Sequence, residues 1–239
     1  LNTDARDAVM KLFDCSYVTV SGFEITAHNG GGIWVDGVTK ESKGVRIENC
    51  EIYDMGAGGI RIFGGAYGCP ETDQTHHISV KDCNISYCGR RYAAGCGILA
   101  NHTYSCEFSG NEISYLDYSG ISVGWVWGYK NSITHDNLIC NNHIHHIGMG
   151  NLSDMGGIYL LGKQRGTVVS GNLIHDVLCS HYGGWGIYTD EGSSYITIEN
   201  NIVYNTSSNC YHQHYGMDNV VRNNVFSRAG DALVKCSIQ

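Results

Sequence analysis

Short stretches in which apolar and polar residues alternate recur along the whole chain. Each stretch runs into a polar turn and an apolar residue, and most are followed by a loop and a Gly-Ile pair. Alternation with a period of two, β-branched residues and frequent Gly and Asn between stretches are typical of β-strands. The apolar residues that follow the turns, called anchors below, are Ile25, Ile52, Ile85, Ile113, Ile144, Ile174, Val203 and Phe226.

The spacing of the anchors defines the repeat. Consecutive anchors are 27, 33, 28, 31, 30, 29 and 23 residues apart. A propeller blade needs about 40–45 residues, and leucine is too scarce for leucine-rich repeats. The chain is therefore expected to be all-β, a right-handed parallel β-helix (a solenoid) of about seven to eight coils, forming one domain over residues 1–239. Neither end shows a cap for the stacked coils, so we expect this domain to be a fragment of a longer protein.

The position two residues before each anchor supports the same register. It is occupied by Phe23, Cys50, Cys83, Asn111, Asn142, Asn172, Asn201 and Asn224. Five consecutive units carry Asn there. Because stacked coils lie ~4.8 Å apart, these side chains are expected to form an internal ladder of hydrogen-bonded amides, with the two Cys residues extending it as small buried groups.

Composition and charge exclude several classes of partner. The chain has 15 Lys and Arg against 23 Asp and Glu, a formal net charge of −8, which argues against binding nucleic acid or a membrane surface. No apolar run is long enough to span a membrane. The eleven cysteines are odd in number and form no C-x-x-C pair, so we expect mostly reduced, buried thiols. The sequence does not define the oligomeric state.

The histidines do not predict a metal site. His143, His145, His146 and His175 follow the strand pattern and are interpreted as strand surface. His212 and His214 could share one strand face, but no further ligands are evident beside them. We therefore expect no metal and no cofactor.

The chemistry-bearing residues gather around units four to six. In the segment 186–190, alternation points Ile187 and Thr189 inward and Tyr188 and Asp190 outward. If His212 lies beside Tyr188, then His214 lies beside Asp190, which predicts a cluster across coils that also includes Tyr159. Aromatic and polar loops on both sides of these units are expected to form a cleft for a sugar.

Two carboxyl groups are needed to hydrolyse a glycosidic bond. Asp190 is the first candidate, with Asp154 reaching in from a loop and Glu191 as its neighbour in sequence. Which acid is protonated is not assigned. We expect His212 and His214 to tune these acids or hold sugar hydroxyls. The residues expected to contact substrate are Trp125, Trp127, Tyr159, Lys163, Trp185, Tyr188, His212 and His214.

Most of the segment 15–230 resembles a known family, and the resemblance is specific in the second half. The segments 156–159, 162–167, 172–176, 186–194 and 200–204 are similar to those of bacterial right-handed parallel β-helix proteins. The most similar family is glycoside hydrolase family 141, which contains α-L-fucosidases and xylanases. The resemblance implies hydrolysis of a plant-type, xylan- or fucose-containing glycan through a pair of aspartates, Asp190 and Asp154. It would place the protein outside the cell or in the periplasm.

Two alternatives remain open. Pectate-type lyases share the β-helix, but they need a cluster of Asp residues for Ca²⁺ and an outward Arg or Lys base. The chain offers Lys163 and Arg165 without such a cluster, and its net charge of −8 opposes a polyuronate. A non-catalytic carbohydrate-binding β-helix would keep the aromatic residues and tolerate the loss of Asp190.

Overall fold

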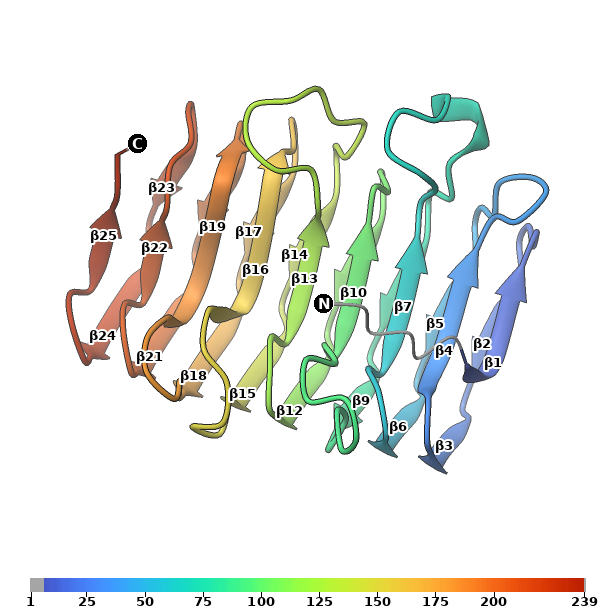
Figure 1. Ribbon diagram of the computed structural model, residues 1–239, viewed down its shortest axis with the longest axis horizontal. Helices are drawn as coiled ribbons and strands as arrows, with labels where there is room; N and C mark the ends of the chain where they lie inside the picture. Colours follow the sequence, from blue (N-terminus) through green and yellow to red (C-terminus); the bar gives the residue numbers. More distant parts are fainter. Residues whose placement is uncertain (1–6, 239) are drawn as a thin grey trace.

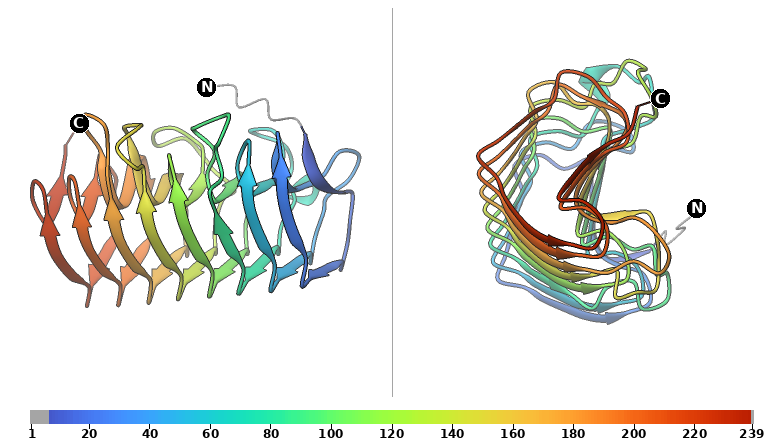
Figure 2. Two further views of the ribbon diagram at one scale, coloured as in Figure 1. Left: turned by 90° about the horizontal axis from the view of Figure 1, so that it is seen from below. Right: turned by 90° about the vertical axis from the view of Figure 1, so that its left-hand side faces the viewer.

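The computed structural model describes residues 7–238, which form a right-handed parallel β-helix, as the sequence predicts (Figure 1). Within this range the chain makes eight complete coils, each adding one strand to each of three parallel sheets, and then enters a further strand, β25. Viewed along the axis, successive coils superpose into one outline (Figure 2). The expected domain also includes residues 1–6 and 239, which lie outside the described residues.

The three sheets run the length of the rod. The first sheet contains, in spatial order, β1 (Ala8–Phe13), β4 (Gly31–Asp36), β7 (Ile60–Phe63), β10 (Ile98–Asn101), β13 (Ile121–Gly124), β16 (Met155–Lys163), β19 (Gly184–Ser194), β22 (Tyr211–Gln213) and β25 (Val234–Cys236). The second sheet contains β2 (Thr19–Ser21), β5 (Arg46–Glu48), β8 (Ser79–Lys81), β11 (Glu107–Ser109), β14 (Leu138–Cys140), β17 (Val168–Ser170), β20 (Thr197–Glu199) and β23 (Val220–Arg222). The third sheet contains β24 (Val225–Ala229), β21 (Ile202–Thr206), β18 (Leu173–Val177), β15 (His143–Ile147), β12 (Glu112–Leu116), β9 (Asn84–Ser86), β6 (Glu51–Met55) and β3 (Glu24–His28).

One short 3₁₀ helix, η1 (Glu71–Asp73), lies in the long loop between β7 and β8. Among residues 7–238, no helix has the length and apolar character that crossing a membrane requires.

The anchors stack in register on the third sheet. Ile25 pairs with Ile52, and the column continues without a slip to Val203 and Phe226. The Gly-Ile pairs form a second column on the first sheet. A Cβ on Gly157 would lie 2.5 Å from the Cγ2 of Ile174 and 2.9 Å from the carbonyl oxygen of Gly186. Glycine recurs at this position because the anchor and the next coil leave no room for a side chain.

The predicted asparagine ladder is present and runs through the core. The Oδ1 atom of Asn172 accepts hydrogen bonds from the Nδ2 and the backbone N–H of Asn142, at 2.9 and 3.0 Å. The same pair of bonds joins Asn111 to Asn142, Asn172 to Asn201, and Asn201 to Asn224. Each interior amide is thus satisfied by its neighbours, which removes the cost of burying it.

The cysteines are free, as expected. All eleven lie in the described range, and six of them are buried: Cys50, Cys83, Cys88, Cys96, Cys106 and Cys210. Burial raises the pKa of Cys83, Cys88 and Cys96 to about 12, so these thiols stay protonated and behave as small apolar groups.

Candidate active site

Strand alternation on β19 separates core residues from cleft residues. Ile187 belongs to the apolar core and Thr189 is fully buried. Tyr188 instead packs into a second, smaller apolar cluster with Tyr159 and Trp185, outside the core. Asp190 follows Tyr188 on the same outward face, as the sequence predicts.

The register between neighbouring coils builds the predicted cluster. Tyr159 of β16 pairs with Tyr188 of β19, which pairs with His212 of β22. One step along, the Nδ1 of His214 lies 2.9 Å from the Oδ1 of Asp190. The expected pairing of both histidines is therefore confirmed.

A cleft of about 620 Å³ opens over the outer face of β16, β19, β22 and β25. The loop that follows β13 borders it with Trp127, and the loop before β19 borders it with His181, Tyr182 and Gly183. Nine of the eleven site residues expected from the sequence line this cleft. They are Trp127, Asp154, Tyr159, Trp185, Tyr188, Asp190, Glu191, His212 and His214.

Asp190 lies at the base of the cleft and accepts three hydrogen bonds. The hydroxyl of Tyr188 donates to its Oδ1 at 2.5 Å, the hydroxyl of Tyr159 donates to its Oδ2, and His214 donates to its Oδ1. The residue is only 6% exposed. Three donors around one carboxylate fix its orientation and stabilise its negative charge.

The two tyrosines keep their protons. Burial raises the pKa of Tyr159 and of Tyr188 far above the usual range, and the neighbouring charge of Asp190 adds to this. Both phenols therefore act as hydrogen-bond donors to Asp190. Their rings pack edge to face, with centroids 5.0 Å apart.

Asp154 has a different environment. It lies just before β16, with a left-handed φ of 59° that Asp tolerates better than most residues. Its backbone N–H donates to the carbonyl of Tyr182, and its carbonyl accepts from the hydroxyl of Tyr118. Burial and the nearby charge of Asp190 raise the pKa of Asp154, while the hydroxyls of Tyr188 and Tyr182 act in the opposite direction. The loop thus brings the second carboxyl group to the cleft, as predicted.

His212 is neutral and stacked. Burial, followed by the charge of His214, lowers the pKa of His212 to about 4. Its ring stacks on Trp185 with centroids 4.6 Å apart. Its Nδ1 atom is buried and has no hydrogen-bond partner among the described residues.

Three predicted residues have other partners. Glu191 accepts a hydrogen bond from the hydroxyl of Tyr215 at 3.0 Å. Trp125 is not among the residues that line the cleft. Its ring stacks on Tyr159, and its Nε1 donates to Ser122. Lys163 is also absent from the lining and sits at the irregular end of β16, opposite Ser194.

The sequence analysis did not predict the wall of the cleft that Asp231 and Lys235 form. Lys235 of β25 pairs with His212 and lies 3.2 Å from Asp231, and both charged groups line the cleft. The alternation of the segment 234–236 resembles that of the earlier strands, but this unit lacks the Gly-Ile pair. Tyr182 belongs to a loop that was expected to border the cleft. Its approach to Asp154 was not predicted, because it depends on the path of that loop.

Comparison with known proteins agrees with the fold. The family model for the right-handed β-helix region matches residues 71–238, more than half of the chain. No curated protein matches the chain significantly.

Three solved structures share the coil arrangement. A glycoside hydrolase is 21% identical with a TM-score of 0.71, over 95% of this chain and 38% of that one. An alginate lyase from Paenibacillus sp. strain FPU-7 is 15% identical with a TM-score of 0.61, over 97% of this chain and 75% of that one. The A-module of a mannuronan C-5 epimerase from Azotobacter vinelandii is 13% identical with a TM-score of 0.58, over 94% of this chain and 63% of that one. At these identities the similarity shows the fold, and the chain spans well under half of the length of that glycoside hydrolase.

Proposed function

The chain belongs to the right-handed β-helix family, and from its cleft we propose that it is a glycoside hydrolase that uses Asp154 and Asp190. One observation carries the proposal: two carboxyl groups with unlike environments face the same aromatic cleft. Such a pair is the requirement for cleaving a glycosidic bond by acid–base catalysis.

The surroundings of the two carboxyl groups favour a different catalytic role for each. Asp154 has a raised pKa, so it is suited to hold a proton and donate it to the leaving glycosidic oxygen. Asp190 accepts from two phenols and an imidazole, so it is suited to remain ionised and act as base or nucleophile. The stereochemistry of the product distinguishes these last two roles. A base that activates water gives inversion, and a nucleophile that forms a covalent intermediate gives retention.

The lining of the cleft favours a neutral glycan. Trp127 is 52% exposed and offers an uncovered ring to an apolar sugar face. Asp154, Asp190, Glu191 and Asp231 line the same cleft, and the cation Lys235 is paired with one of them. This excess of acids opposes a polyuronate. The resemblance to family 141 narrows the proposal to xylan- or fucose-containing plant-type glycans.

The two alternatives make different demands on the cleft. A Ca²⁺-dependent lyase needs clustered oxygen ligands, whereas both oxygens of Asp190 are already hydrogen-bonded to Tyr and His donors. In the part of the chain that the structure describes, a group of three metal-ligating side chains does occur, but it lies outside the cleft. A non-catalytic binding protein would bind the glycan without turning it over.

The first experiment is an activity screen of the purified chain with EDTA present. Xylan, fucosylated pectic oligosaccharides and polygalacturonate are offered, and both reducing ends and ultraviolet absorbance of unsaturated products are followed. Release of reducing sugar from xylan or the fucosylated substrate supports the hydrolase. Asp190→Asn should lower this rate by about 10²–10⁴-fold.

Asp54→Asn is the matched control, because Asp54 is an exposed carboxylate at a similar left-handed position far from the cleft. It should keep the wild-type rate. Unsaturated products that require added Ca²⁺ would identify a lyase instead. Glycan binding without any product, unchanged in Asp190→Asn, would leave the binding protein as the better account.

A further inference from the structure

A cluster of histidines lies on the third sheet, away from the cleft. Its members occupy two outward columns of the register. In one column Glu112 of β12 pairs with His143 of β15, and in the next column His145 of β15 pairs with His175 of β18. The neighbouring positions Ile113 and Ile144 point into the core. The four polar side chains are therefore neighbours on one outer surface that spans three coils.

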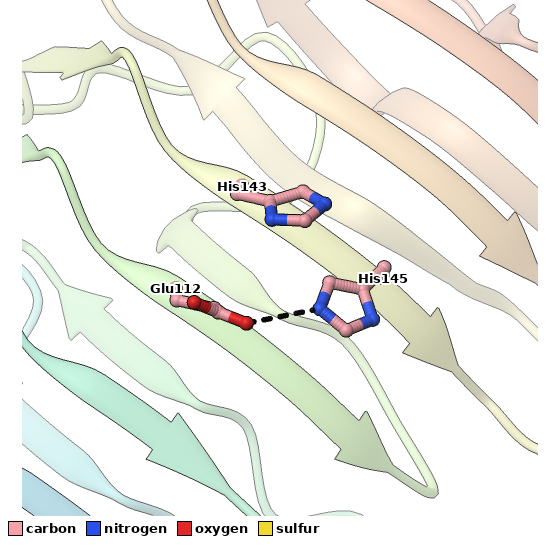
Figure 3. Close-up of side chains that lie close together, drawn as sticks. All are labelled: Glu112, His143 and His145. Atoms are coloured by element: carbon pink, nitrogen blue, oxygen red, sulfur yellow. Dashed lines mark hydrogen bonds and ion pairs between the residues drawn. The ribbon is translucent and has the colours of Figure 1, made fainter.

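Three of these residues converge on one point. A ligand atom from each of Glu112, His143 and His145 lies within 4.8 Å of the others. Figure 3 shows the carboxylate of Glu112 directed at the ring of His145, with the ring of His143 beside both. The Nε2 of His145 is 3.4 Å from the Oε1 of Glu112. Two imidazoles and one carboxylate are a ligand set that suits Zn²⁺ and related divalent ions.

The hydrogen bonds around the cluster determine which ring nitrogen of His143 carries a free lone pair. The Nδ1 of His175 lies 2.7 Å from the Oδ2 of Asp176, and an N–H must donate there because the carboxylate only accepts. The Nε2 of His175 is then an acceptor. The Nε2 of His143, 2.9 Å away, donates its proton to it. In this arrangement the Nδ1 of neutral His143 is free to bind a metal.

His145 has to change its tautomer to bind a metal. Its Nδ1 is 2.7 Å from the Nδ1 of His146, so one of the two nitrogens donates and the other accepts. In the metal-free protein the Nε2–H of His145 donates to the carboxylate of Glu112, which only accepts. A metal bound between them would displace this proton, and the Nδ1–H of His145 would then donate to His146. In the metal-bound state, each ligand imidazole would donate a hydrogen bond from its other N–H to a fixed partner. Metal-binding histidines in proteins are usually oriented in this way by an outer shell of acceptors.

We infer that Glu112, His143 and His145 form a Zn²⁺-type metal site that links the coil of β12 to the coil of β15. His175 is a positioning residue, because it acts on the metal through the hydrogen bond to His143. The inference is independent of the proposed hydrolase activity, since the site is on a different sheet. It also differs from the sequence-based expectation that these histidines are only strand surface.

The test is calorimetric titration of untagged, EDTA-treated protein with ZnCl₂, together with the visible spectrum after adding Co²⁺. Wild type should bind one Zn²⁺ and show Co²⁺ absorption bands. Glu112→Gln should weaken Zn²⁺ binding about tenfold or more. Because Glu112 is exposed, this variant is expected to fold. Glu51→Gln, two coils earlier in the same register column, is the matched control and should bind like wild type.

His175→Phe tests the positioning role. Phe keeps the ring that stacks on Tyr204 and His145, but it cannot accept the proton of His143. Zn²⁺ binding should weaken by about 10–100-fold, with the Co²⁺ bands retained at high metal concentration. The site is overturned if wild type shows no one-to-one Zn²⁺ binding, or if Glu112→Gln binds Zn²⁺ as tightly as Glu51→Gln.

Discussion

At the scale of single residues, two aspartates in one cleft differ because of what surrounds them. Asp190 lies on the outward face of β19 and accepts hydrogen bonds from donors in or beside three strands. Asp154 sits in a loop, where burial and the charge of Asp190 disfavour its ionised form. Alternation and register were enough to place Asp190 and its partners. They could not give the environment of Asp154, because that depends on how the loops carrying Asp154 and Tyr182 fold together.

Replacing Asp154 by Asn tests this environment through stability. The folded-state pKa of Asp154 is raised, so the protonated form favours the fold, and this contribution is lost as pH rises through that pKa. Asn resembles the protonated acid. We expect Asp154→Asn to have a melting temperature at least equal to wild type at pH 7, with hydrolysis abolished. The advantage should disappear below the unfolded-state pKa of about 3.9.

Thermal unfolding from pH 3 to pH 8 measures this difference directly. Asp54→Asn serves again as the control and should show no such pH-dependent gain. A melting temperature for Asp154→Asn that falls below wild type at pH 7 would contradict the raised pKa and the assignment of Asp154 as the acid.

At the scale of elements, the sequence predicted the columns that cross the coils. The anchors, the Gly-Ile pairs and the asparagines recur at fixed offsets, and each column is present in the structure. The histidine cluster was readable by the same rule. Glu112 and His143 each precede an anchor by one residue, so the register already set them side by side. What the sequence did not supply was the orientation of the rings.

The asparagine ladder can be broken at one rung. Asn172→Ala removes the Oδ1 that accepts two hydrogen bonds from Asn142, leaving two buried donors unpaired. Each unpaired donor costs about 1–3 kcal/mol, so the free energy of unfolding should fall by several kcal/mol. Urea denaturation followed by circular dichroism measures the loss.

Asn224→Ala is the comparison for this prediction. Asn224 accepts the same two bonds from Asn201, but it is only partly buried, so water can replace the lost acceptor. Its effect should be clearly smaller. Equal losses in the two variants would mean that burial of the ladder is not what makes its hydrogen bonds matter.

At the scale of the whole molecule, stability is distributed from coil to coil. Each strand pairs with the equivalent strand of the next coil, and one apolar core runs along the rod. The period of the repeat was sufficient to predict this architecture. The extent of the cleft was not, because the wall that includes Lys235 belongs to a unit that lacks the Gly-Ile pair.

The reactivity of the cysteine thiols measures whether the coils of the rod stay packed. Cys236 is exposed, whereas six cysteines are buried and three of these have pKa values raised to about 12 by burial. Titration with a chromogenic disulfide reagent at pH 8 should therefore show a fast phase from Cys236, and the buried thiols should react only after unfolding in denaturant. Cys236→Ser should lose the fast phase. Rapid reaction of the six buried thiols in the native protein would contradict the packed core.

The ladder also gives the rod an electrical direction. Along the sheets, backbone N–H and C=O groups point alternately up and down the axis, so their dipoles largely cancel. The side-chain amides from Asn111 to Asn224 do not alternate, because every oxygen faces the earlier coil and accepts from it. Aligned dipoles of this kind reinforce one another. The interior therefore has a negative and a positive end, and its positive end lies among the later coils, the ones that carry the cleft.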